Sequence, residues 1–152
     1  MTLYSFFRSS AAYRLRILHA LYGPGTRRVL LEAGLQRGMH VADLGCGVGT
    51  VTSLLADLVG SEGQVVGIDA SGAQLAQARA HLNGVGANAT FIEASATVTG
   101  LPAELFGLVY CRFLLIHLPD PERALHVMRT LLKGKRGREW LCRKPSENLT
   151  LA

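Results

Sequence analysis

The sequence of residues 41–50 reads Val-Ala-Asp-Leu-Gly-Cys-Gly-Val-Gly-Thr, an apolar run that gives way to three alternating glycines. We interpret it as a buried strand, a tight turn and the start of a helix that continues over residues 51–58. Glycines in the turn allow positive φ angles and leave room for a ligand to approach the backbone. The first amides of the helix are hydrogen-bond donors that face such a ligand. The stretch therefore predicts a cofactor-binding turn.

The spacing of these glycines narrows the class of cofactor. A dinucleotide-binding turn reads G-x-G-x-x-G and a phosphate-binding loop ends in Gly-Lys-Ser/Thr, whereas this turn reads G-x-G-x-G and no lysine follows it. Asp43, two residues before the first glycine, would repel a pyrophosphate but suits a ligand that carries an ammonium or sulfonium group. The turn therefore favours a cationic cofactor over a phosphate.

A second acidic residue follows at an informative distance from the turn. Residues 64–68 predict a second buried strand, and Asp69 stands at its tip, about twenty residues past Gly49. A carboxylate at that place can accept hydrogen bonds from both ribose hydroxyls of an adenosine.

At this point the chain resembles the class I S-adenosylmethionine-dependent methyltransferases, whose first motif reads as residues 43–49 do. Further similar segments lie at residues 101–110, 117–121 and 131–134, so that the resemblance covers residues 10–134. Within the family, the chain most resembles the small-molecule group that includes the quinone-biosynthesis methyltransferases. The resemblance implies S-adenosylmethionine as the cofactor, a small-molecule methyl acceptor, and no metal.

The resemblance also implies roles for individual residues. Asp43 would face the charged methionine end of the cofactor, and Asp69 would bind the ribose. The full set of candidate cofactor-binding residues is Asp43, Gly45, Cys46, Gly47, Gly49, Asp69, Ala70, Ser71, Ser95 and Ala96. His117 is a candidate general base, with a packed or solvent-facing histidine as the alternative. Cys46 is either a reactive thiol at a helix N-terminus or a small residue that fills the turn.

The order of the expected elements predicts the fold class. Strands that alternate with helices predict an α/β fold, a Rossmann-like parallel sheet with helices on both faces. We divide the chain into N-terminal helices that cap the site (1–34), a cofactor-binding core (35–134) and a basic tail (135–152). The sheet is expected to be incomplete at its C-terminal edge. The density of basic residues in the tail argues against a central strand there. Without such a strand, the expected fourth strand, residues 106–110, would lie at the edge of the sheet.

Helix boundaries follow from capping residues and from helix-breaking residues. A first helix over residues 12–21 is expected to end at Gly23-Pro24-Gly25, after which Thr26 caps a second helix that ends near Gly34. Ser71 is expected to cap a helix that closes at Asn83-Gly84, and Asp120 with Pro121 to start another.

Two single residues depart from the family pattern. The family usually carries an acid that binds the adenine amino group, and we assign that position to Val98, which accepts no hydrogen bond. The loss of one such bond weakens binding by about 1 kcal/mol. Gly107 stands before the expected fourth strand, where the family often has Asp.

Composition limits the remaining possibilities. The net charge is +5, and most of it lies in the tail, so we expect a solvated charge run and no nucleic-acid partner. No apolar run is long enough to span a bilayer, and the three cysteines have neither disulfide-framework nor metal-ligand spacing, which favours a reducing, cytoplasmic setting. Two alternatives to an active methyltransferase stay open here: a non-catalytic cofactor-binding or interaction module, and a nucleotide-dependent oxidoreductase, which the glycine spacing disfavours.

Overall fold

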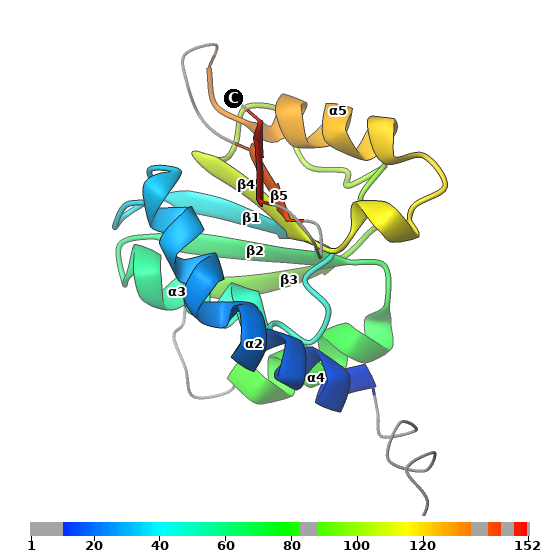
Figure 1. Cartoon of the computed structure of the whole chain (residues 1–152). Helices are drawn as coiled ribbons and strands as arrows, with labels where there is room; N and C mark the ends of the chain where they lie inside the picture. The colour runs from blue at the N-terminus through cyan, green and yellow to red at the C-terminus, as the bar shows by residue number, and fades with distance from the viewer. Residues whose placement is uncertain (1–10, 83–87, 135–139, 144–147, 152) are drawn as a thin grey trace, which may run out of the picture.

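A single sheet organises the part of the chain that the structure, a computed structural model, describes: residues 11–82, 88–134, 140–143 and 148–151 (Figure 1). Its strand order is β3-β2-β1-β4-β5-β6. The strands are β1 (His40–Leu44), β2 (Gln64–Asp69), β3 (Ala89–Glu93), β4 (Leu108–Arg112), β5 (Trp140–Arg143) and β6 (Asn148–Leu151). β1 to β5 pair in parallel, and β6 runs antiparallel to β5. The predicted α/β fold with a parallel sheet is confirmed.

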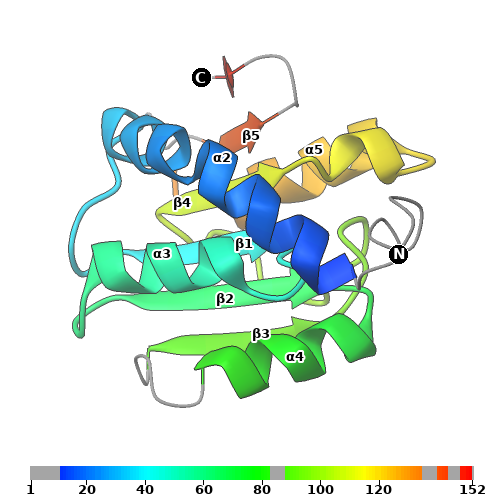
Figure 2. The same ribbon diagram turned by 60° about the horizontal axis from the view of Figure 1, so that its bottom comes forward.

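Helices cover both faces of this sheet (Figures 1 and 2). α2 (Ala11–Glu32) and α3 (Thr50–Val59) pack against each other on one face, and α5 (Pro121–Leu131) lies on the other. α4 (Gly72–Leu82) packs along β3 and β2, and a short 3-10 helix, η1 (Leu115–His117), follows β4. The carboxyl ends of β1 to β4 therefore meet at one edge of the sheet, where the predicted site residues lie.

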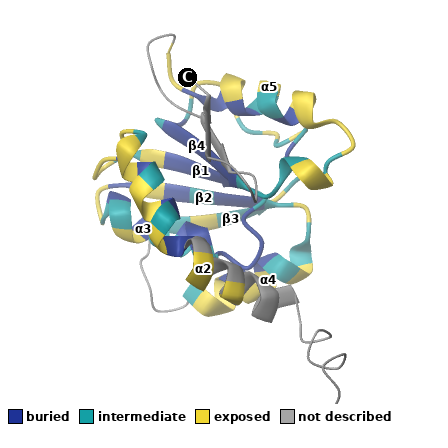
Figure 3. Ribbon diagram, viewed as in Figure 1, coloured by how far each residue is buried: buried dark blue, intermediate teal, exposed yellow. Residues whose placement is uncertain are grey.

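The alternation of side chains along β1 produces two separate hydrophobic cores. Val41 packs in the core that contains Leu30 of α2 and Leu55 of α3, whereas its neighbour Ala42 packs in the core that contains Met128 of α5. Successive strand residues point to opposite faces of a sheet, and here both faces are covered. β1 and β4 are consequently buried along most of their length, as Figure 3 shows.

Two of the predicted helix starts are confirmed by their capping hydrogen bonds. Ser71 Oγ accepts a hydrogen bond from Gln74 N (3.3 Å) at the start of α4, and Asp120 Oδ1 accepts one from Arg123 N (3.0 Å) at the start of α5. α5 also has its proline at the first helical positions. The expected end of α4 at Asn83-Gly84 lies outside the described residues.

The expected break of the first helix is wrong. α2 runs without interruption through Gly23-Pro24-Gly25, with Pro24 inside it. A proline removes one donor to the carbonyl four residues earlier, and because Ala20 and Pro24 are both exposed, that carbonyl lies on the solvent side. Thr26 caps no new helix. Its side chain is 0% exposed and its Oγ1 accepts a hydrogen bond from Arg112 Nη1 (3.4 Å), so tertiary packing overrides the local helix-breaking tendency.

The expectation that β4 forms the sheet edge is also wrong. β5 pairs with β4 from Val109↔Trp140 to Arg112↔Arg143, and β6 pairs with β5 in turn. The charge averaged over the whole tail hides an uncharged run, Trp140-Leu141-Cys142, that lies between Glu139 and Arg143 and forms most of β5. β6 is the last strand of the sheet in the part of the chain that the structure describes.

The division into three segments stays a prediction. Within the described residues, α2 shares a core with β1, α3 and β4 through Leu30. Gly107, which replaces the family's usual Asp, donates a backbone hydrogen bond to His40 O (2.9 Å) where β4 begins beside β1. None of the described helices is both long enough and apolar enough to cross a membrane.

Candidate functional site

The turn after β1 takes the left-handed conformation that its glycines allow. Gly45, Gly47 and Gly49 have φ angles of 70°, 57° and 80°. The amides of Gly45 and Cys46 both donate to Ile68 O, at 2.7 and 3.1 Å, so the turn bends toward the end of β2. Gly49 is the N-cap residue of α3 and, having no side chain, leaves the first turn of that helix without a side-chain cap. The predicted strand, turn and helix are confirmed.

The protein itself fills the space next to two of these glycines. A Cβ atom on Gly45 would lie 2.7 Å from Leu114 Cδ1, and one on Gly49 would lie 3.1 to 3.2 Å from side-chain atoms of Ala78, Leu82 and Phe91. A side chain at either position would be strained by the positive φ angle and would require these neighbouring side chains to shift. Protein side chains therefore occupy space beside these two glycines that was expected to admit a ligand.

Asp69 connects the turns that follow β1 and β2. Its Oδ2 accepts a hydrogen bond from Gly47 N (2.9 Å) and its Oδ1 accepts one from Ser71 N (2.8 Å). The carboxylate is partly buried, and each of its oxygens has a second lone pair. Asp69 is thus held in a fixed orientation by two backbone amides while it retains capacity to accept hydrogen bonds from a ligand. Ala70 beside it is exposed.

Asp43 lies beneath the turn and is not on its surface. The side chain is 2% exposed, and one oxygen accepts a hydrogen bond from Thr52 Oγ1 of α3 (2.7 Å). Burial raises the pKa of Asp43 to about 7; the hydrogen bond from Thr52 and the charge of Arg112 act in the opposite direction, and Asp69 adds to the rise. The predicted role of Asp43 at the methionine end stays a prediction.

Cys46 fills the turn as a small buried residue. It is 8% exposed, and its Sγ would lie 3.0 Å from a Cβ atom on Gly67. Burial, and after it the charges of Asp43 and Asp69, raises the pKa of the thiol. A thiol with a raised pKa is a poor nucleophile at neutral pH, so the geometry favours the packing interpretation over the reactive one.

The segment after β3 reaches the same edge of the sheet. Glu93 is in register with Asp69, and Ala94 N donates to Asp69 O (3.0 Å). Ser95 Oγ and Thr97 Oγ1 are hydrogen-bonded (2.9 Å), Ala96 is buried, and Val98 is 62% exposed. Ser95 and Ala96 follow Ala94 at this edge of the sheet, and their role beside an adenine stays a prediction.

The segment after β4 approaches the turn from the other side. Phe113 has a positive φ angle of 59°, which is strained for an aromatic residue and bends the chain toward η1. Leu114 then packs on Gly45, and the exposed His117 ends η1. His117 as a general base stays a prediction.

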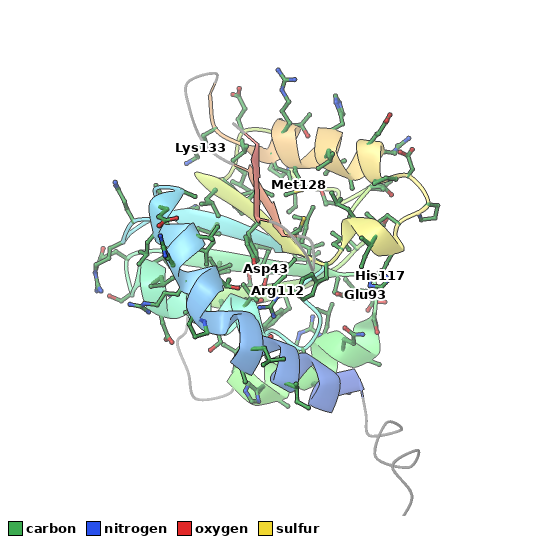
Figure 4. The ribbon with its side chains drawn as sticks, viewed as in Figure 1. Asp43, Glu93, Arg112, His117, Met128 and Lys133 are labelled. Carbon is green, nitrogen blue, oxygen red and sulfur yellow. The ribbon has the colours of Figure 1, made fainter. Side chains whose placement is uncertain are left out.

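Arg112 is a residue of this site that the sequence argument missed. It ends β4, its Nη1 donates to Thr26 Oγ1, and its Cζ lies 5.5 Å from the ring centroid of Phe113. Figure 4 places Asp43 and Arg112 close together at the ends of β1 and β4, with Lys133 at the opposite end of β4. A single arginine in an apolar strand gives no local pattern, and only the pairing of β1 with β4 brings it to Asp43. In the described part of the chain no three His, Cys, Asp or Glu side chains form a group that could bind a metal ion.

A family model described as a methyltransferase domain matches residues 41–135, which is more than half of the chain. The chain belongs to this methyltransferase domain family. The match runs from β1 to just beyond α5 and includes Asp43, the glycine turn, Asp69 and the segment after β4. It favours the methyltransferase interpretation over a nucleotide-dependent oxidoreductase.

The methyltransferase domain is similar in sequence to a curated relative. The ubiquinone/menaquinone biosynthesis C-methyltransferase UbiE of Pseudoalteromonas translucida is 31% identical over 109 residues. The matched stretch covers 70% of this chain and 43% of that protein, so the chain spans less than half the length of this relative.

Solved structures agree with the fold of this methyltransferase domain. An S-adenosylmethionine-dependent methyltransferase from Aquifex aeolicus is 26% identical with a TM-score of 0.69, over 76% of this chain and 61% of that chain. The [4+2]-cyclase SpnF is also 26% identical, with a TM-score of 0.67, over 89% of this chain and 46% of that chain. The Rossmann-like methyltransferase fold is shared by a methyltransferase and by a protein named for a cyclisation, so the fold alone does not define the reaction.

Proposed function

We propose that this chain binds S-adenosylmethionine at the carboxyl edge of its sheet and transfers the methyl group to a small-molecule acceptor. The observation that carries the proposal is the orientation of Asp69 by the amides of Gly47 and Ser71. A carboxylate already fixed in this way is prepared for the two ribose hydroxyls of the cofactor.

The topology supports this location. From β1 the chain continues to β2 and β3 on one side, and β4 lies on the other side of β1. In open α/β sheets, ligands bind outside the carboxyl ends of the strands at such a reversal of strand order. The glycine turn and Leu114 flank that point, with Asp69 one strand away on β2.

The residues present fit the cofactor at its nucleoside end. Asp69 would bind the ribose, and Ala70, Ser71, Ser95 and Ala96 would border the adenine. Asp43 and the turn residues Gly45, Cys46, Gly47 and Gly49 would lie under the sulfonium and methionine end. Val98 supplies an exposed apolar side chain where the family usually has an acceptor for the adenine amino group.

The chemistry requires mainly positioning from the protein. When bound, S-adenosylmethionine would supply a methyl group on a positively charged sulfur for in-line transfer to the acceptor. Correct alignment of the two reactants provides a large part of the rate enhancement. We propose His117, exposed at the end of η1, as the group that takes up the proton released by the acceptor.

The acceptor and the setting are proposed at the level of class. The similarity to UbiE, named for ubiquinone and menaquinone biosynthesis, supports a small organic acceptor and no nucleic acid. Cys46 and Cys111 are buried free cysteines, which is compatible with the proposed cytoplasmic setting.

Calorimetry with S-adenosylmethionine tests the proposal. We expect Asp69→Ala to weaken binding at least tenfold, about 1.4 kcal/mol, because the ribose loses its acceptor. Asp57→Ala is the matched control, since Asp57 is an exposed carboxylate on α3. A wild-type chain that unfolds cooperatively but binds no S-adenosylmethionine would contradict the proposal.

A non-catalytic cofactor-binding module is the second candidate. The absence of a hydrogen-bond acceptor at Val98 and the similarity to a cyclase both favour it. The two candidates differ in turnover: a methyltransferase releases S-adenosylhomocysteine in the presence of a panel of small phenolic and quinol acceptors, whereas the module binds the cofactor and releases none.

A further inference from the structure

The side of α2 that is turned away from the sheet carries apolar side chains, although a surface helix normally carries polar ones there. Among the residues that the structure describes, five large apolar side chains are exposed, and three of them, Ile17, Leu21 and Leu31, lie on α2. Leu21 is the most exposed of the three, at 69%. The opposite side of the helix packs in the core, where Thr26 and Leu30 are fully buried. α2 therefore has one side in the core and an apolar side in solvent.

The exposed apolar residues of α2 form one continuous surface. Ile17, Pro24 and Leu31 are spaced seven residues apart, close to two helical turns, so they lie in line along one side of the helix. Pro24 is exposed as well, and Leu21 stands next to this line, four residues after Ile17. From Ile17 to Leu31 the line is about 21 Å long, at a rise of 1.5 Å per residue. We call these four residues the α2 outer face. Contiguous exposed apolar surface of this kind marks a site of interaction.

The segment that contains the α2 outer face is strongly basic. Residues 1–31 hold five arginines and no acidic residue, a formal charge of +5, whereas residues 32–132 hold five arginines and nine acidic residues, a charge of −4. Arg27 and Arg28 are exposed on the same side of α2 as the apolar residues. Arg28 Nε donates to Glu32 Oε1 (2.7 Å), while Arg27 forms no ion pair with any residue that the structure describes. The α2 outer face is thus accompanied by positive charge.

We propose that the α2 outer face docks this chain on the surface of an anionic lipid bilayer. An interfacial helix lies in the plane of the membrane with its apolar side chains at the boundary between headgroups and acyl chains, and basic residues beside them attract anionic lipids. The α2 outer face has both features, and α2 lies on the outside of the molecule in Figures 1 and 2. This docking does not depend on the methyl transfer proposed above.

Charge and apolar surface together favour a lipid bilayer over two other occupants. A second copy of the chain would bring another segment of charge +5 against the first, and like charges that meet across an interface oppose association. A nucleic acid would attract the arginines through its phosphates but would leave Leu21 and Leu31 without an apolar partner. An anionic bilayer offers negative headgroups to the arginines and acyl chains to the leucines.

Sedimentation with lipid vesicles tests the docking. The full chain is mixed with vesicles of equal parts phosphatidylglycerol and phosphatidylcholine, or with vesicles of phosphatidylcholine alone. We expect binding to the anionic vesicles to be at least tenfold stronger and to weaken as salt is added, because salt screens exposed charges. The double variant Leu21→Gln/Leu31→Gln should weaken binding to the anionic vesicles at least tenfold, and Arg27→Gln should weaken it about fivefold.

Exposed residues outside α2 provide matched controls. Ile116→Gln removes an apolar side chain of similar exposure, 55%, from η1, and Arg129→Gln removes an exposed cation from α5. Both control variants should bind the anionic vesicles as the wild type does. Because the substituted side chains are exposed, urea unfolding should give free energies close to that of the wild type for every variant.

The inference fails on any of three results. A wild-type chain that unfolds cooperatively but binds neither kind of vesicle has no lipid-docking face. Unchanged binding by Leu21→Gln/Leu31→Gln and by Arg27→Gln would place the lipid contact elsewhere on the chain. A dimer in analytical ultracentrifugation that dissociates in the leucine variant, without vesicle binding by the wild type, would assign the α2 outer face to a second copy. Calorimetry with S-adenosylmethionine on the same preparations reports separately on the proposed function.

Discussion

Replacement of Asp43 by asparagine is expected to remove much of the pH dependence of stability. Asp43 is 2% exposed, and burial raises its pKa from 3.8 to about 7 in the folded chain. A folded-state pKa above the unfolded value means that the folded chain binds the proton more tightly. The contribution of protonated Asp43 to the free energy of unfolding is therefore complete below about pH 3.8. It declines as the pH rises and is lost above about pH 7.

The size of the effect follows from the shift. The difference between 3.8 and about 7 is roughly three pKa units, and each unit corresponds to 1.36 kcal/mol. The free energy of unfolding of the wild type should fall by up to about 4 kcal/mol across this range, with a slope of at most about 1.4 kcal/mol per pH unit. In Asp43→Asn, the amide side chain would keep an oxygen that can accept the hydrogen bond from Thr52, which is 2.7 Å long in the wild type, and would carry no charge to desolvate.

Urea unfolding between about pH 4 and pH 8.5 measures this difference. The asparagine variant should show a flatter profile and should exceed the wild type in stability at the alkaline end. Asp57→Asn, at an exposed position on α3, is the control and should follow the wild-type profile. Parallel profiles of unfolding free energy against pH for the wild type and Asp43→Asn would refute the reasoning. They would mean that Asp43 does not titrate between pH 3.8 and about pH 7.

Three further changes test the packing and capping. Gly45→Ala should lower the free energy of unfolding by about 1 to 3 kcal/mol, because its Cβ meets Leu114 Cδ1 at 2.7 Å and its φ angle is 70°; combination with Leu114→Ala should relieve the clash but not the φ strain. Pro24→Ala should stabilise the chain by up to about 3 kcal/mol in urea unfolding, since it restores a donor within α2, and a loss would show that the proline is needed. Asp120→Ala should cost about 1 kcal/mol in thermal unfolding by removing the acceptor for Arg123 N; an unchanged melting temperature would contradict that role.

Local signals in the sequence were sufficient for the parts of the fold that depend on neighbouring residues. The alternating glycines of residues 45–49 require positive φ angles and end an apolar run, so strand, turn and helix could all be placed. Asp120 followed by Pro121 defined the start of α5 because both act within one helical turn. The place of Asp69 at the end of β2 could be predicted because its distance from the turn is set by the length of one helix and one strand, while its role as a site residue stays a prediction.

The parts that could not be predicted depend on distant contacts. Pro24 is a helix breaker by local rules, and the packing of Thr26 against Arg112, 86 residues away, is not visible in the sequence. β5 and β6 were missed because the charge of the whole tail concealed two short segments that pair in the sheet. Arg112 was missed for a related reason, since its place beside Asp43 follows only from the register of β1 with β4.

The two hydrogen bonds that Asp69 accepts from Gly47 and Ser71 have a practical consequence for experiments on this site. Because both backbone amides already point at the carboxylate, its orientation is fixed before any ligand arrives, and little conformational entropy remains to be lost on binding at this point. The amide protons of Gly47 and Ser71 can also be observed by NMR spectroscopy. When a ribose hydroxyl approaches Asp69, the electron density on its oxygens changes, and the amide resonances of Gly47 and Ser71 should shift together, which reports occupancy with an unlabelled ligand.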